Sequence, residues 1–168
     1  MAVSINGTTG ITTPALDSVA PFSSADMPAG GVLQVVSAAY ATTTATSSTS
    51  YVDTGLTASI TPLSSSSKIL VSTTISFYLS GGGADNGCAF QIVRGAASIL
   101  SPTSNSVYIA GPTASTEQIF NFPLLYLDSP STTSATTYKI QMAGVNGSTI
   151  SVQNSGNKSV IVLTEIAG

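Results

Sequence analysis

The segment Lys68–Ser80, KILVSTTISFYLS, alternates between two sets of residues more regularly than any other part of the chain. One set is Ile69, Val71, Thr73, Ile75, Phe77 and Leu79, and the other is Leu70, Ser72, Thr74, Ser76, Tyr78 and Ser80. A helix would mix the two sets, whereas a strand places each on its own face. The segment therefore predicts a β-strand with one apolar face and one hydroxyl-rich face.

Similar strand patterns lie on both sides of this segment. Val32–Tyr40 and Ser50–Ile60 precede it, and Val52, Leu56 and Ile60 share one face of the second. The strands expected after it are Cys88–Arg94, Ala96–Leu100, Val107–Ala110, Glu117–Asp128, Thr136–Val145, Thr149–Gln153 and Lys158–Ile166. We expect the Ser/Thr run Thr42–Ser50 and the glycine-rich Gly81–Gly87 to be connections. Asn146-Gly147 predicts a hairpin, because both residues tolerate the positive φ of a type I′ turn.

About nine or ten closely spaced strands without a helical period predict an all-β fold, either a jelly roll or another β-sandwich. The 168 residues suit a single domain, which we place at residues 31–168 behind an extended N-terminal arm, residues 1–30. Ser and Thr supply 51 residues and charged residues only 7%, so hydroxyls rather than charges cover the core. A net charge of −3 protects weakly against association, which suits a protein that functions in an assembly.

The arm contains five isolated apolar residues among glycines and prolines: Ile5, Ile11, Leu16, Val19 and Phe22. We expect these side chains to attach the protein to other proteins of a larger particle. The alternative is an unstructured tail. Fully extended, the arm would reach on the order of 100 Å.

Two of the expected strands are apolar on both faces. In Glu117–Asp128 and in Lys158–Ile166, a sandwich would bury only one of these faces, so the second needs a cover. One possible cover is a loop or the arm of the same chain. The other is a second subunit, which is favoured because large apolar patches mark contact sites. The predicted subunit-interface residues are Phe120, Phe122, Leu125, Leu127, Ile161 and Leu163. Pro123 indicates a bulge or an edge strand.

The composition argues against several function classes. Histidine is absent, so a Ser-His-Asp or Cys-His system is excluded, and the seven acidic residues are dispersed. We therefore expect no catalytic, metal or cofactor-binding residues and no enzymatic activity. The four basic residues Lys68, Arg94, Lys139 and Lys158 are scattered, which argues against nucleic-acid binding. Without a long apolar run or a signal peptide, we expect neither membrane insertion nor export. Cys88 is expected to be a buried, inert thiol.

Several short motifs resemble those of tailed-phage virion proteins. They are Gly31–Val36, Tyr51–Leu56, Ser67–Val71, Val93–Gly95, Leu127–Pro130, Thr136–Lys139 and Leu163–Ile166, which together extend over about four-fifths of the chain. The resemblance is to small tail or head fibres and spikes with a jelly roll of the C1q and tumour-necrosis-factor group. It implies a homotrimer at the outer end of a fibre, located in the virion after synthesis in the host cytoplasm. The shortness of the arm departs from long fibres with a large shaft.

Two functions follow from this resemblance. The first is a fibre or spike subunit whose arm joins other virion proteins and whose jelly roll faces outward, with host surface glycan as a candidate partner. The alternative is a capsid decoration (cement) protein that stabilises the head shell. The loops Gly81–Gly87, Ser101–Ser106 and Ser129–Ser134 contain no Trp, so an aromatic sugar platform has little support.

Overall fold

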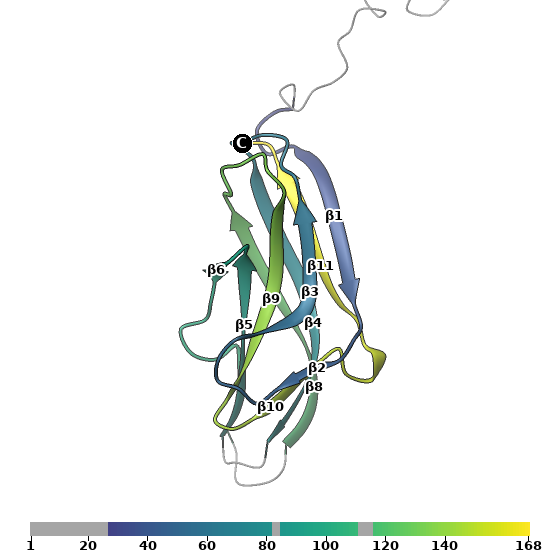
Figure 1. Ribbon diagram of the computed structural model, residues 1–168, viewed down its shortest axis with the longest axis vertical. Coiled ribbons are helices and arrows are strands. Elements are labelled where there is room, and N and C mark those ends of the chain that lie inside the picture. Colours follow the sequence, from purple (N-terminus) through teal and green to yellow (C-terminus); the bar gives the residue numbers. More distant parts are fainter. Residues whose placement is uncertain (1–26, 82–84, 111–115) are drawn as a thin grey trace, which may run out of the picture.

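A computed structural model describes residues 27–81, 85–110 and 116–168 (Figure 1). These residues form eleven strands and a three-residue 3-10 helix, η3 (Asn154–Gly156). The strands are β1 (Val32–Tyr40), β2 (Thr44–Thr46), β3 (Val52–Ile60), β4 (Lys68–Gly81), β5 (Asp85–Arg94), β6 (Ala97–Leu100), β7 (Val107–Ala110), β8 (Thr116–Asp128), β9 (Thr136–Val145), β10 (Thr149–Val152) and β11 (Ser159–Ile166). The predicted all-β fold class is confirmed.

The strands form two antiparallel sheets. In the first, β1 pairs with β11, and β11 and β10 share one edge of β4. Strand β8 pairs with the other edge of β4 along its whole length, and the short β2 pairs with β10. In the second sheet β3 pairs with β9 and β9 with β5, and β6 and β7 occupy different parts of the other edge of β5.

This strand order is that of a jelly roll. The order β1-β11-β4-β8 in one sheet faces β3-β9-β5-β6 in the other, so the chain crosses repeatedly between sheets (Figure 1). A continuous core lies between them. Its largest fully buried side chains include Tyr138, Phe77 and Phe90. The inward set predicted for β4, from Ile69 to Leu79, is buried throughout.

Three local predictions were wrong. Thr44–Thr46, within a predicted connection, forms β2 because it pairs with β10. Strand β5 begins at Asp85 rather than at Cys88, because its first residues pair with β7 and Gly87 N donates to Ser148 Oγ at 2.9 Å. Asn146 and Gly147 have the predicted positive φ, 54° and 77°, but the turn is no hairpin, because β9 and β10 lie in different sheets.

Candidate subunit interface

Strand β8 is an edge strand of the first sheet. Its thirteen residues pair with β4 from Thr116 to Asp128 without a register shift, and it pairs with no other described strand. Pro123 lies in the middle of this ladder, opposite Thr74. Of the two explanations for Pro123, a bulge or an edge strand, the structure shows the edge strand.

The inner face of β8 belongs to the sandwich core. Phe120 stacks on Phe77 with the ring centroids 5.2 Å apart, and Phe122 stacks on Phe90 at 5.6 Å. Leu124 and Tyr126 pack against the same core. Stacked rings of this kind contribute about 0.5–1.5 kcal/mol beyond the area they bury. Phe120 and Phe122 are therefore primarily core residues, although they were predicted at an interface.

The outer face of β8 is apolar and exposed. Ile119, Leu125 and Leu127 are 64%, 66% and 46% exposed. Directly paired residues of an antiparallel sheet share a face, so the outward residues form rows across all four strands. Three of these rows are Val35-Thr164-Leu70-Leu127, Ser37-Val162-Ser72-Leu125 and Ala39-Val160-Thr74-Pro123. These rows and Ile119 define the apolar face, which contains no charged residue.

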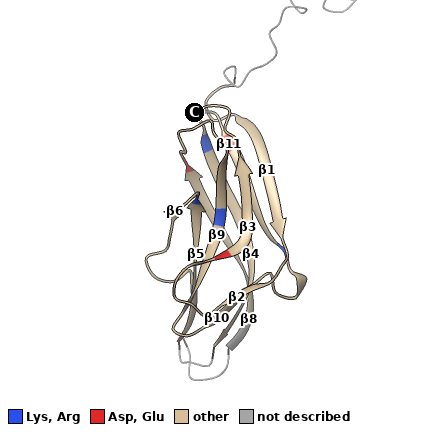
Figure 2. Ribbon diagram, viewed as in Figure 1, with Lys and Arg blue, Asp and Glu red and all other residues tan. Residues whose placement is uncertain are grey.

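The outer face of the second sheet is built differently. The Asp53 carboxylate accepts hydrogen bonds from Lys139 Nζ at 3.0 Å and from Gln141 Nε2 at 2.7 Å. Gln91 Nε2 donates to Gln141 Oε1 at 2.6 Å, and Ser98 Oγ donates to Gln91 Oε1 at 2.8 Å. These five residues, on β3, β9, β5 and β6, define the polar face. Asp53 and Lys139 form an ion pair between β3 and β9, and Figure 2 shows a red segment on β3 and a blue segment on β9.

The hydrogen bonds lower the pKa of Asp53 below its ordinary value of 3.8. The bond from Gln141 is the largest cause, and Lys139 adds a further hydrogen bond and its positive charge, against a smaller opposing effect of burial. The carboxylate therefore stays ionised at neutral pH. The polar face meets water as a hydrogen-bonded, charged surface.

The structure places two of the predicted interface residues inside the sandwich core. Ile161 and Leu163 are fully buried, because β11 turns its odd-numbered residues inward and its even-numbered residues outward. The outward neighbours Val160 and Val162 belong to the apolar face instead. Of the original six candidates, Leu125 and Leu127 are the exposed ones. The predicted attachment residues Ile5, Ile11, Leu16, Val19 and Phe22 lie outside the described residues.

An ion pair fixes one end of β8 to the second sheet. Arg94 Nη1 donates to both oxygens of Asp128, at 2.9 and 2.8 Å, and the Tyr138 hydroxyl donates to Asp128 Oδ2 at 2.7 Å. Burial, with the nearby Asp128, raises the pKa of Tyr138. The sequence analysis missed this cluster, because Arg94 lies far from Asp128 and Tyr138 in the sequence and meets them only through the pairing of β4, β5, β8 and β9.

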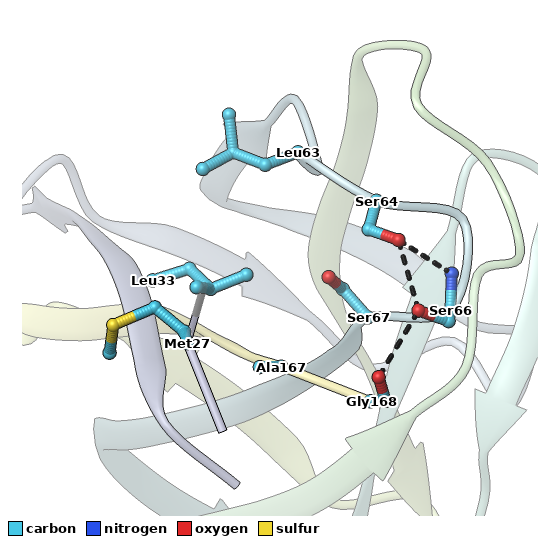
Figure 3. Close-up of a pocket in the computed structure, with 8 residues that line it drawn as sticks. All are labelled: Met27, Leu33, Leu63, Ser64, Ser66, Ser67, Ala167 and Gly168. Atoms are coloured by element: carbon cyan, nitrogen blue, oxygen red, sulfur yellow. Dashed lines mark hydrogen bonds between the residues drawn. The ribbon is translucent and has the colours of Figure 1, made fainter. Parts of the chain in front are cut away.

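One cavity lies where the arm enters the domain (Figure 3). Its volume is about 430 Å³, and its lining includes Met27, Leu33 and Leu63 from the chain around β1 and β3. Two of its three serine hydroxyls are already engaged, since Ser64 and Ser66 bond each other at 2.9 Å and Ser66 Oγ donates to Gly168 O at 3.3 Å. No charged side chain lines the cavity.

Chemically reactive groups are sparse in the described part of the chain. Residues 27–81, 85–110 and 116–168 contain no group of three His, Cys, Asp or Glu side chains that could hold a metal ion. Burial raises the pKa of the Cys88 thiol to about 12. No helix among these residues is long and apolar enough to span a membrane.

The predicted loops do not form one platform. Strands β4 and β8 are antiparallel, so Gly81 at the end of β4 and the segment 129–134 after β8 lie at opposite ends of the sandwich. A single glycan platform made of both loops is therefore excluded by the topology.

Comparison with known proteins gives no family assignment. No family model matches the chain, and no curated protein matches its sequence. Among solved structures, it is similar to the infectious bursal disease virus Gx strain (10% identity, TM-score 0.40) and to the VP2 subviral particle of infectious bursal disease virus (10% identity, TM-score 0.43). Each match covers 100% of this chain and 42% of the viral chain. This chain thus spans about two-fifths of those chains, and likeness of this degree carries no functional argument.

Proposed function

We propose that this protein is a structural subunit of a virus particle, a fibre or spike component that assembles through its apolar face into a homotrimer. The observation that carries the proposal is the apolar face around Leu125 and Leu127, whose three rows are uncharged although the exposed Lys68 lies on β4 in the row beside them. Soluble monomers rarely leave so wide an apolar surface in water. A subunit contact would cover it.

The remaining parts of the proposal draw on the sequence. The short motifs resembling phage fibre and spike proteins support the virion role, and their similarity to the C1q and tumour-necrosis-factor group supports three subunits. Closed cyclic symmetry would use up the apolar faces around one axis and prevent open-ended aggregation. The arm would join the subunit to other virion proteins, and host surface glycan remains the proposed outward partner. No catalytic step is proposed.

The oligomeric state tests assembly directly. Light scattering at micromolar concentration should give a mass about three times 16.8 kDa. Leu125→Asp should give a folded monomer, because one charge on each apolar face would be buried unpaired in the contact. Ser59→Asp is the control, since it adds the same charge to an exposed position of the second sheet. A monomeric unmodified protein, or equal behaviour of the two variants, would contradict the proposal.

The number of copies per particle separates the fibre from the capsid decoration protein. Both would use the apolar face, so the monomeric fold does not distinguish them. Quantitative mass spectrometry of purified particles should find tens of copies or fewer for a fibre or spike. A count of hundreds of copies would instead favour the capsid decoration protein. The apolar face would still be the proposed contact surface in that case.

A further inference from the structure

The free edges of the two sheets differ in how well they are protected. Strands β1 and β3 each contain a register shift, and β3 also carries the charged Asp53. The other edge strands, β2, β6 and β7, have only three or four residues. Bulges, charges and shortness are the usual ways in which an edge avoids pairing with another chain.

Strand β8 has almost none of these protections. It is thirteen residues long, its pairing with β4 is regular throughout, and residues 118–127 contain no charge. Pro123 removes a single N–H donor. A long, regular, uncharged edge is a template to which an extended segment can add as a further strand.

We propose that residues 3–13 of the arm of a neighbouring copy complete this edge as an added strand. The inference rests on the proposed assembly and identifies the segment that joins one subunit to the next. Residues 3–13 lie outside the described part of the chain, so their sequence supplies the argument. They contain neither charge nor proline, and their odd positions include Val3, Ile5, Thr9 and Ile11, whereas the even positions are Ser4, Asn6, Thr8, Gly10 and Thr12. This alternation suits a strand with one apolar face.

The direction of the chain favours a neighbour's arm over the subunit's own. Strand β1 begins at the end of the sheet where β4 begins and β8 ends, because Val32 pairs with Ile166, which pairs with Lys68. An arm that folded straight back from there along its own β8 would run parallel to it, and it could run antiparallel only if residues 14–26 first crossed the whole length of β8, whereas every described strand pair is antiparallel. A neighbour's arm is free to run antiparallel, the slightly more stable arrangement.

Length and symmetry agree with this assignment. The thirteen residues 14–26 reach roughly 43 Å when extended, about the length of β8 itself. Around a threefold axis β8 cannot pair with its own copy, since such a contact requires a twofold axis. A different segment must meet it. Leu16, Val19 and Phe22, outside the added strand, then remain for attachment to the particle.

Hydrogen exchange of the β8 amides in the full-length protein tests the added strand. Alternate amides of β8, those that point away from β4, should exchange at least about tenfold more slowly than in an arm variant. The variant is Thr8→Pro with Thr9→Pro, because one of two adjacent N–H groups always faces the partner strand. Ser23→Pro with Ser24→Pro is the matched control and should keep the protection. A synthetic peptide of residues 2–14, added to the arm variant, should restore it.

Each other outcome overturns the inference. Unprotected β8 amides in an unmodified trimer would leave the proposed assembly intact but remove the added strand. Protection that survives in the arm variant would identify another occupant, such as a different surface of a second copy. A monomer with arm-dependent protection would show that the arm pairs within its own subunit, and in that case the proposed assembly fails as well.

Discussion

The two outer faces of this sandwich rest on similar strands and meet their surroundings in opposite ways. On the polar face, Asp53, Lys139, Gln141, Gln91 and Ser98 bond one another across four strands. On the apolar face, the rows ending at Leu127, Leu125 and Pro123 offer valine, leucine and hydroxyl side chains without a charge. The inward halves of all these strands build one core, so the outward residues alone decide which sheet faces water and which needs a partner.

The largest expected difference in stability is between a core position and an apolar-face position of the same strand, β11. Ile161→Asp places an unpaired charge in the core and should unfold the domain, at a cost on the order of 4 kcal/mol or more. The adjacent Val160→Asp lies on the apolar face, where the side chain is 37% exposed, and should fold but not associate. Circular dichroism melting and light scattering distinguish the two. If Ile161→Asp melts like the unmodified protein, the assignment of inward and outward residues in β11 is wrong.

A smaller effect is expected on the polar face. Gln141→Leu removes the link between Asp53 and the nearly buried Gln91, and the loss of the partner of Gln91 Nε2 should cost about 1–3 kcal/mol. Because the new leucine stands alone among polar groups, the oligomeric mass should not change. Urea unfolding measures the loss, and light scattering measures the mass. A larger oligomeric mass would show that one apolar residue on the polar face suffices for association. The difference in association between the polar and the apolar face would then not hold.

Much of the fold could be predicted from the sequence because strand periodicity is a local property. The alternation in Lys68–Ser80 and the double apolar pattern of β8 both appear in the structure. Pairing between distant strands leaves no such signal. For this reason β2 and the contact of Arg94 with Asp128 and Tyr138 were missed.

The candidate interface was only partly predictable for the same reason. The sequence shows that β11 is apolar on both faces, yet it does not say which face is inward. The structure decides this through Ser159 and Glu165, buried residues in phase with Ile161 and Leu163. The core face of a strand is usually its more apolar face. Because polar residues occupy inward positions in β11, this criterion did not identify its core face.

Acid should act on the fold before it acts on association. Burial alone would raise the pKa of Glu165, but hydrogen bonds, chiefly from Gln34 and also from the Leu63 N–H, lower it below its ordinary value of 4.5. As pH falls, the unfolded chain takes up a proton first, so protonation favours unfolding. The stabilisation is complete above about pH 4.5 and is lost as pH falls through the folded-state pKa.

The three rows of the apolar face contain no carboxylate that could respond in the same range. Melting temperatures measured from pH 7 to pH 3 should therefore decline below about 4.5, and the decline should be shallower in Glu165→Gln. The light-scattering mass should stay constant until unfolding begins. A mass that drops while the melting temperature is unchanged would place a titrating group in the contact, and the apolar face would then be the wrong surface.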